Sequence, residues 1–297
     1  MGRLGRRARK VGQTRIVLLT LAPLLVLAVV VVTPARGVAS GLAIRMADGI
    51  GNAFQPSGAV TRAGQTFSGV AAVGALVRES RPGELGPHFC TASVVNSPAG
   101  DLAVTAAHCV TGDSSVTGNS SVTGNSSNGS PGTLVFAPGY ANGKAPYGTW
   151  PVLQVYANAA WQASQDPDDD VAFIKLAPAA DGLPIEDITG AETLATGWPA
   201  HTYVRVIGYP DGAAQPVLCD NWADSFSATQ LVFDCGGYTN GTSGGPFLAA
   251  VSGATGQGTL IGVIGGYEQG GDTPSVSYSV AFGPKVAGLF RTAEAGG

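Results

Sequence analysis

Short apolar segments separated by turn residues make up most of the chain from Phe67 onward. They are rich in Val, Ile, Phe and Tyr, and Gly, Pro, Asn and Asp lie between them, which is typical of β-strands joined by turns. A helical pattern is found only near the C-terminus, where residues 284–291 predict a short helix. The sequence therefore predicts an all-β barrel or sandwich. The segments are VAAVGALV, TASVV, LAVTAAHCV, TLVFAPGY, VAFIKL, YVRVIGY, QLVFDC and TLIGVIGGY.

The first 39 residues predict a secretory signal peptide. A basic head precedes an apolar run over 16–32, and small residues follow before the expected cut. An uncleaved membrane anchor is the alternative, because the run approaches the length that spans a bilayer. Residues 40–65 have no sustained periodicity and predict a leader or pro-segment. The folded domain is then expected over 66–297.

Removal of the signal leaves a strongly acidic domain. The full chain has 16 basic and 20 acidic residues, and seven of the basic ones lie in the first 39 residues, which hold no acidic residue. The remainder has 9 basic against 20 acidic residues, a formal net charge of −11. No basic stripe is left for nucleic acid, so we expect no nucleic-acid partner. The composition is typical of an exported bacterial protein.

Four cysteines in an exported chain indicate disulfides. They allow three pairings, of which the sequence-local one closes two short loops, each contributing roughly 3 kcal/mol in the chain-entropy model. A zinc site is the competing interpretation, but the sequence contains no Cys-x-x-Cys pair, and we expect no metal. The cysteines are Cys90, Cys109, Cys219 and Cys235.

The segment CGGYTNGTSGGPF, over 235–247, presents a serine between glycines. Ser243 is the candidate nucleophile, and the N–H groups of Gly241 and Ser243 are the candidate oxyanion hole. The same letters fit the Gly-x-Ser-x-Gly elbow of α/β-hydrolases, which requires a histidine later in the chain. All three histidines precede Ser243, so that interpretation is rejected; they are His88, His108 and His201.

Acyl transfer also needs a base and a group that orients it. His108 in VTAAHC is the candidate base, and Asp170, directly before the apolar run VAFIKL, is the candidate orienting acid. The other acids of the DPDDD run, at 166, 168 and 169, are expected to form a solvated turn. His88 and His201 are expected to be structural or surface residues.

Together these segments resemble the chymotrypsin-like (trypsin-fold) serine proteases of the secreted bacterial branch. The order His108, Asp170, Ser243 is the order of that family. The resemblance covers about residues 66–292 and implies two antiparallel β-barrels with the three side chains in the cleft between them. The barrels are expected to meet near 177–190. It also implies that Cys90 pairs with Cys109 and Cys219 with Cys235.

Two positions depart from the family pattern around the substrate. Gly237 falls where the trypsin branch has an acid, and Ile264 is followed by Gly265-Gly266-Tyr267 instead of Ser-Trp-Gly. The missing serine removes a hydroxyl that commonly supports the aspartate. With Gly237, Gly265, Gly266 and Tyr267 as the substrate-binding residues, we expect an uncharged primary pocket that favours apolar or small residues.

A third departure precedes the nucleophile. Most of the family has an aspartate there, and in the animal-type enzymes a newly cut N-terminal amine pairs with it. This chain has Thr242. Thr242 carries no charge, so we expect an active site that forms without such an ion pair.

The sequence is thus interpreted as a secreted, monomeric serine endopeptidase that acts on protein or peptide substrates without a cofactor and meets the membrane only through its signal segment. Two alternatives remain, an inactive protease-fold binding module and an esterase on the same fold.

Overall fold

The computed structural model describes residues 62–81, 83–111 and 133–296, which belong to one compact unit. The predicted signal peptide and the leader up to residue 61 lie outside the described residues. The second sheet takes in residues 63–65, which the sequence prediction assigned to the leader: Ala63 forms a bridge with Gly236, and Gln65 pairs with Leu218.

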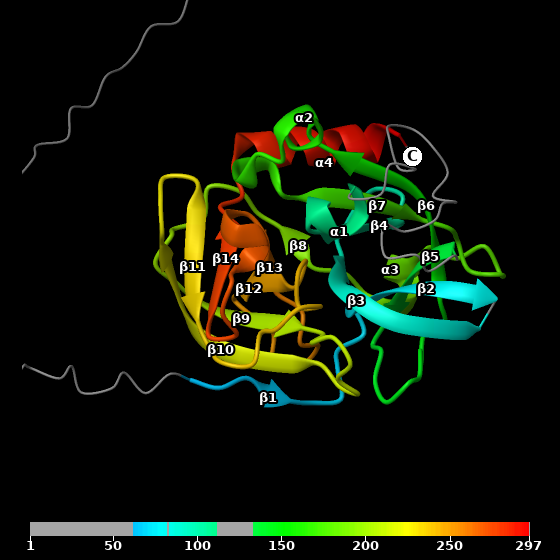
Figure 1. Ribbon diagram of the computed structural model, residues 1–297. Helices are drawn as coiled ribbons and strands as arrows, with labels where there is room; N and C mark the ends of the chain where they lie inside the picture. The colour runs from blue at the N-terminus through cyan, green and yellow to red at the C-terminus, as the bar shows by residue number, and fades with distance from the viewer. Residues whose placement is uncertain (1–61, 82, 112–132, 297) are drawn as a thin grey trace, which may run out of the picture. The chain divides into compact units, whose positions relative to one another are not determined.

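The first half of the described chain forms a closed antiparallel barrel, with the strand order β2-β3-β4-β7-β6-β5 (Figure 1). Alternate residues point inward, so that Leu76, Phe136 and Ile174 are fully buried in its centre. The bounds are β2 Val73–Arg81, β3 Glu84–Val94, β4 Leu102–Thr105, β5 Thr133–Pro138, β6 Trp150–Ala157 and β7 Ala172–Leu176.

The second half forms an eight-stranded sheet with the order β14-β11-β10-β9-β12-β13-β8, and β1 pairs with β10. A bridge between Ile264 and Ser279 joins the β13 side to β14, so the sheet curls around Phe233 and Phe247. The predicted two-barrel fold is confirmed. The bounds are β1 Gln65–Thr66, β8 Thr193–Leu194, β9 Thr202–Gly208, β10 Val217–Ser225, β11 Gln230–Asp234, β12 Pro246–Ala249, β13 Thr259–Val263 and β14 Val276–Val280.

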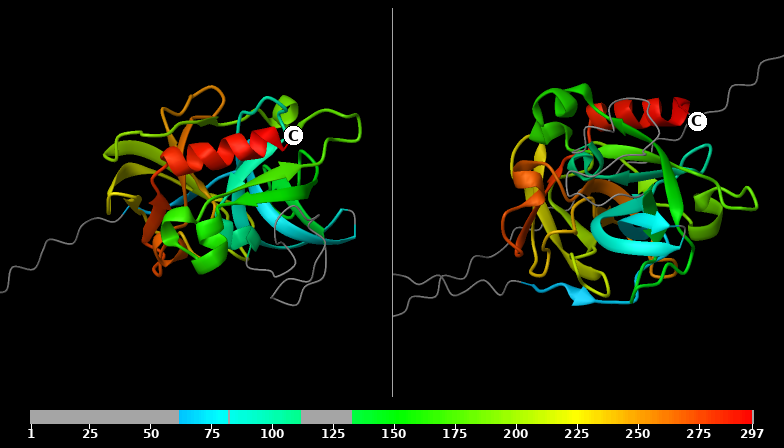
Figure 2. Two further views of the ribbon diagram at one scale, coloured as in Figure 1. Left: turned by 90° about the horizontal axis from the view of Figure 1, so that it is seen from above. Right: turned by 45° about the vertical axis from the view of Figure 1, so that its right-hand side comes forward.

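The predicted C-terminal helix is confirmed as α4, Pro284–Ala295, which is longer than expected. It returns to the first barrel and contacts β6 and β7 (Figures 1 and 2), where Phe290 packs on Phe173 with ring centroids 5.1 Å apart. Within the described ranges no helix is long and apolar enough to cross a membrane. The other helices are α1 Ala107–Thr111, α2 Ala159–Ser164, η1 Pro167–Asp169, α3 Ile185–Thr189 and η2 Tyr267–Gly270.

Both expected disulfides are present. Cys90–Cys109 ties β3 to α1, and Cys219–Cys235 ties β10 to the residue after β11. The closed loops span sequence separations of 19 and 16 residues. One bridge therefore stabilises each half of the fold, by roughly 3 kcal/mol in the chain-entropy model.

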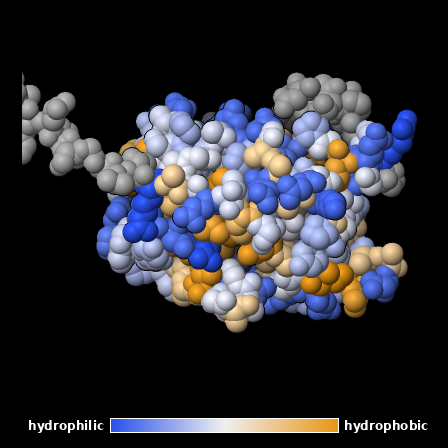
Figure 3. Space-filling view, turned by 90° about the horizontal axis from the view of Figure 1, so that it is seen from below, coloured by the Kyte–Doolittle hydropathy of each residue, from blue (hydrophilic) through white to orange (hydrophobic). Residues whose placement is uncertain are grey.

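On the face shown in Figure 3, hydrophobic residues form separate patches among hydrophilic residues. The exposed large side chains of the described residues are mostly aromatic, and some of them are in contact: Tyr203 with Trp222, and Phe226 with Tyr267. Exposed apolar side chains are ordinary on a globular surface.

The connection between the two barrels contains a buried acid. Glu192 lies two residues beyond the predicted boundary region, after α3, and its backbone pairs with Val94 and Asn96 at the end of β3. Its Oε2 accepts a hydrogen bond from the N–H of Gly258, whereas Oε1 has no partner in the described residues. Burial raises the pKa of Glu192 to about 7.

This acid makes the stability of the fold depend on pH. The folded state holds the proton up to about pH 7 and the unfolded chain releases it near pH 4.5, so stability falls as the pH rises through that window, by up to about 3 kcal/mol. Glu192→Gln keeps the acceptor for Gly258 and should flatten this part of the profile. Thermal unfolding at pH 4.5 to 8 measures it, with the exposed Glu84→Gln as the control. A Glu192→Gln profile parallel to the wild-type one would contradict the assignment.

Candidate active site

Two of the candidate residues, His108 and Ser243, line one cavity of about 580 Å³. His108 reaches it from the first barrel, and Ser243 lines it from the second. The cavity is therefore a cleft between the two barrels, which is where the resemblance placed the site.

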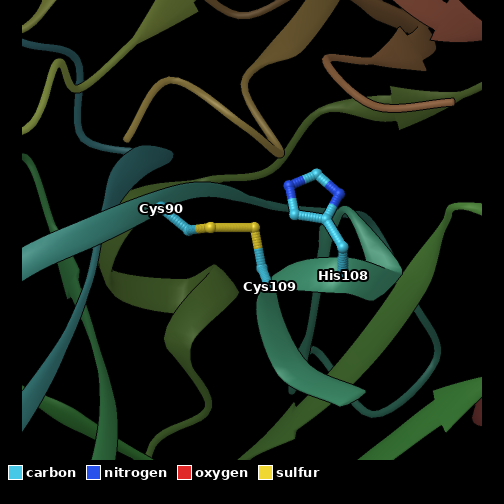
Figure 4. A group of neighbouring side chains, drawn as sticks. All are labelled: Cys90, His108 and Cys109. Carbon is cyan, nitrogen blue, oxygen red and sulfur yellow. A yellow bond between two sulfur atoms is a disulfide. The ribbon is translucent and has the colours of Figure 1, made fainter. Parts of the chain in front are cut away.

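His108 is fixed by its position on a short helix. It is the second residue of α1, which begins two residues after β4 ends, and the neighbouring Cys109 is held to β3 by the disulfide with Cys90. Figure 4 shows the imidazole beside this disulfide. His108 and the two sulfur atoms lie close enough to resemble a metal-ligand group, but both sulfurs are engaged in the disulfide and offer no thiolate.

The carboxylate of Asp170 holds the imidazole. Its Oδ2 lies 2.8 Å from His108 Nδ1, and its Oδ1 accepts the backbone N–H of His108 at 2.9 Å. The Asp170 side chain is 0% exposed, against 14% for His108. A carboxylate only accepts hydrogen bonds, so Nδ1 carries the proton and Nε2, on the opposite edge of the ring, is left as the basic nitrogen.

The N–H of Gly266 donates to Asp170 Oδ2 at 2.9 Å and supplies a third hydrogen bond. The hydroxyl that the sequence analysis found missing is thus replaced by a backbone donor of the second barrel. A Cβ on the neighbouring Gly265 would lie 3.0 Å from the same oxygen. The absence of a side chain at Gly265 allows this close approach.

The expectation of a solvated turn for the rest of the acidic run is wrong for Asp169. Asp169 is 2% exposed and pairs with Lys285 of α4 at 2.6 Å, and it accepts a hydrogen bond from Asn158. Asp166 caps η1 by accepting the N–H of Asp168. The run is therefore a hydrogen-bonded loop that holds Asp170 in position. Its side chains bind partners such as Lys285 that lie far away in the sequence.

Ser243 lies on the loop between β11 and β12. The loop turns through Gly241 (φ 91°) and Gly244 (φ 80°), in the left-handed region where glycine is favoured. A Cβ on Gly244 would collide with the backbone carbonyl of Thr91 on β3. The two glycines therefore allow the loop to pass tightly against the first barrel. Among the described residues Ser243 makes no direct hydrogen bond to His108, and such bonds often tighten only when substrate binds.

Two N–H groups of this loop have no hydrogen-bond acceptor among the described residues. The N–H groups of Thr242, Gly244 and Gly245 donate to the carbonyls of Thr239, Ile264 and Thr242. Those of Gly241 and Ser243 donate to no acceptor in the described part of the chain. They are the two groups that the sequence analysis assigned to an oxyanion hole.

The four residues expected to bind substrate do not line the cavity. Gly237 lies against Gly64 of the N-terminal segment, and Gly265 and Gly266 lie against Asp170. The Tyr267 ring packs with Phe226 and Tyr278 outside the lining set. Gly237 was assigned to the pocket from its distance in sequence to Ser243. That distance does not reveal that the N-terminal segment pairs with the chain beside Gly237.

Three carboxylates that the sequence analysis did not single out line the cavity. Asp211, Glu268 and Asp272 are all exposed there, and no Lys or Arg lies among the lining residues. Glu268 and its neighbour Gln269 both have left-handed backbone angles, with φ near 50°. These acids lie on loops without a motif, so no local sequence signal marks them.

Two polar residues that the sequence analysis did not single out connect the barrels at this site. Thr91 on β3 is fully buried and bonds to the loop of Ser243. Gln230 bonds through Nε2 to Asp168 and through Oε1 to the N–H of Tyr267, so it joins the acid loop to the opposite wall. Nothing in the local sequence of either residue marks it.

The other two histidines lie apart from the cavity lining. His88 is buried, and its Nε2 lies 2.9 Å from the carbonyl oxygen of Ala213. His201 is exposed on the second sheet and pairs with Asp224 at 2.6 Å. Both match the expected structural or surface roles.

Comparisons with known proteins agree with this architecture. No protein-family model and no curated protein matches the chain. Among solved structures, the protease Anisep from Arthrobacter nicotinovorans is 21% identical, with a TM-score of 0.62 over 78% of this chain and 99% of its own. The thermostable serine protease AL20 from an extremophilic microorganism is 23% identical, with a TM-score of 0.60 over 76% and 98%. A Glu endopeptidase in complex with MPD is 15% identical, with a TM-score of 0.57 over 79% and 97%.

These likenesses define the class of fold. The chain has the two-barrel, chymotrypsin-like fold, and the three similar structures named above are a protease, a serine protease and an endopeptidase. Sequence identities below 25% support a shared fold only, so the chemistry of this chain depends on its own residues.

Thr242 is satisfied inside its own loop. It is 3% exposed, and its hydroxyl donates to the carbonyl of Thr239 at 2.8 Å. A buried aspartate here would need a charged partner, whereas a hydroxyl needs one hydrogen bond, worth about 1 kcal/mol net. The loop therefore has no charge for an N-terminal amine to neutralise.

We expect this site to form whatever the N-terminus is. One form should begin at Arg62, which bonds to the carbonyl of Asp220, and a second should carry several extra residues before it. Both should react with a fluorophosphonate at Ser243 at rates within about 3-fold of each other, because no ion pair switches the loop. Reaction of only the form with a defined free N-terminus would show that another acidic partner exists.

Proposed function

We propose that this chain is a secreted serine endopeptidase that hydrolyses peptide bonds through an acyl-enzyme. The observation that carries the proposal is the buried Asp170 carboxylate bonded to His108 at the edge of the cavity that Ser243 lines. A nucleophile, a base and an orienting acid from three separate segments meet there, together with two unused N–H groups.

The proposed chemistry follows from these positions. His108 Nε2 takes the proton of Ser243 as its oxygen attacks the substrate carbonyl, and Asp170 stabilises the imidazolium that forms. The N–H groups of Gly241 and Ser243 bind the negative oxygen of the tetrahedral intermediate. His108 then gives the proton to the leaving amine, and water repeats the sequence to release the acid.

Secretion is part of the proposal, with residues 1–39 as a signal peptide. Its support in the described residues is the pair of disulfides, which persist in oxidising compartments. We further propose that the enzyme acts as a monomer without metal or cofactor, since the triad supplies both the nucleophile and the proton transfers.

Two outcomes would favour the alternatives. A chain that a fluorophosphonate does not label is an inactive binding module. A labelled chain that cleaves simple esters but no member of a peptide library is an esterase.

Removal of a triad member should abolish turnover with the fold intact. Ser243→Ala and His108→Ala should each lower kcat on the order of 10⁶-fold, because the members act as a unit. Asp170→Asn should cost about 10⁴-fold through the wrong tautomer. Peptide hydrolysis and thermal unfolding measure both effects.

The control is His201→Ala, which breaks a second His–Asp pair outside the cavity lining. It should retain wild-type kcat. Peptide cleavage by Ser243→Ala at a near-normal rate would refute the assignment.

The cavity also supports a proposal on substrate charge. Three exposed carboxylates attract a cationic side chain and repel an acidic one, each by an amount typical of exposed pairs, up to about 1 kcal/mol. We propose that this enzyme selects peptides with Lys or Arg near the cut bond and rejects those with Glu.

A matched peptide series should show this selection. We expect kcat/KM for a Lys-containing peptide to exceed that for its Glu counterpart by roughly 10-fold at low salt and to fall toward equality at high salt. Glu268→Gln with Asp272→Asn should reduce the ratio, whereas Asp187→Asn on α3 should not. Dominant cleavage at apolar residues in both salts would contradict the proposal.

A further inference from the structure

Thr91 lies where the first barrel contacts the loop of Ser243. It is on β3, directly after the disulfide-bonded Cys90, and it is fully buried. Its Oγ1 accepts the N–H of Tyr209 at 2.9 Å and donates to the carbonyl of Gly241 at 3.0 Å. Its own N–H donates to the carbonyl of Ser243 at 2.8 Å. One residue therefore holds both ends of the segment 241–243.

A further threonine fixes Thr91 in turn. The hydroxyl of Thr105, also fully buried, donates to the carbonyl of Thr91 at 2.8 Å. The Cβ position of Gly244 points at these same two residues. With the hydroxyl, N–H and carbonyl of Thr91 all engaged, it has no alternative arrangement that satisfies its buried polar groups.

The carbonyls of residues 240–243 are all bound, which fixes the direction of the N–H groups between them. A peptide plane carries its N–H opposite its carbonyl, so a held carbonyl aims the N–H of the next residue. Thr91 binds the Gly241 and Ser243 carbonyls. Among the described residues, its side chain is the only one that donates a hydrogen bond to any of these four carbonyls. The donors, in order, are the N–H of Asp211, Oγ1 of Thr91, the N–H of Gly245 and the N–H of Thr91.

Of these four carbonyls, that of Gly241 depends most on its hydrogen bond. Gly241 has φ 91° and no side chain, so its following peptide plane can turn at little steric cost. A turned plane would carry the N–H of Thr242 out of its bond to Thr239 and disturb the neighbouring plane that bears the N–H of Ser243. The hydroxyl of Thr91 opposes that turn.

We propose that Thr91 is a positioning residue that holds the Ser243 N–H of the oxyanion hole in place across the barrel interface by fixing the peptide planes on either side of it, a task that an ion pair cannot perform in this chain because Thr242 is uncharged. The inference rests on the proposed function. If Thr91 has this role, formation of the oxyanion hole depends on the packing of β3 against the loop of Ser243.

The test compares three single variants. Thr91→Val removes the hydroxyl and keeps the shape, and Thr91→Ser restores the hydroxyl. Thr189→Val is the matched control, since Thr189 on α3 is also buried and its hydroxyl bonds to Ile185, away from the site. Each is assayed for kcat and KM per active site titrated with a fluorophosphonate, and for thermal unfolding.

A hydroxyl that positions the hole should affect kcat alone. Loss of a direct oxyanion donor costs about 10²–10³-fold in kcat, so we expect Thr91→Val to lose roughly 10- to 100-fold with KM within about 3-fold. Thr91→Ser and Thr189→Val should keep kcat within about 3-fold. A kcat of Thr91→Val equal to that of Thr189→Val, or a loss in Thr91→Ser as large as in Thr91→Val, would overturn the proposal.

A pair of inhibitors gives a second readout that general destabilisation would not move. A peptide aldehyde adds the Ser243 hydroxyl across its carbonyl to form a hemiacetal whose oxygen occupies the hole, whereas the matching peptide alcohol cannot. Thr91→Val should weaken the aldehyde by the same factor as kcat and leave the alcohol unchanged. Equal weakening of both would show a disturbed cleft instead and would overturn the proposal.

Two further results separate the possible failures. If Thr91→Val does not fold, Thr105→Val releases the Thr91 carbonyl instead and should lower kcat without changing KM; an unchanged kcat overturns the proposal. If the wild-type chain is neither labelled nor active on peptides, the proposed function itself fails. A wild-type chain that is active beside an equally active Thr91→Val removes only the inference about Thr91.

Discussion

The buried carboxylate of Asp170 is the interaction on which the arrangement of the site depends. It accepts hydrogen bonds from the ring and the backbone of His108 in the first barrel and from the N–H of Gly266 in the second. A charged group is tolerated away from water only when its oxygens are bonded in this way. Any shift of one barrel against the other would break at least one of these bonds, so the acid fixes both the imidazole and the barrel interface.

The residues around Asp170 hold its loop in position. Asp169 pairs with Lys285 at the start of α4, the helix that packs on β6 and β7 of the first barrel. Gln230 joins the same loop to the wall at Tyr267. An acidic run without such partners would be solvated and loose. The side chains that surround the loop therefore convert it into a rigid support.

On the other side of the cleft the nucleophile loop is held by neutral groups. Thr242 bonds within the loop, and Thr91 reaches it from β3. Neutral hydrogen bonds of this kind depend little on pH or on the state of the N-terminus, in contrast to a buried ion pair, whose loss leaves a charge alone. Burial raises the pKa of Glu192, in the connection between the barrels, and we expect the pH dependence of stability between its unfolded and folded pKa values to come from this group.

The sequence by itself determined the all-β class, the C-terminal helix and the positions of the candidate triad, and its resemblance to the chymotrypsin-like proteases implied the two disulfide pairings. These follow from local signals, namely the strand pattern and short motifs around His108, Asp170 and Ser243 in a characteristic order. Only the tertiary structure decided which residues support the site and which line the cavity. Thr91, Gln230 and the three cavity carboxylates act through contacts between segments far apart in the chain, and no local pattern encodes such contacts. The same reason explains why Gly237 and Tyr267 were assigned to a pocket that other residues line.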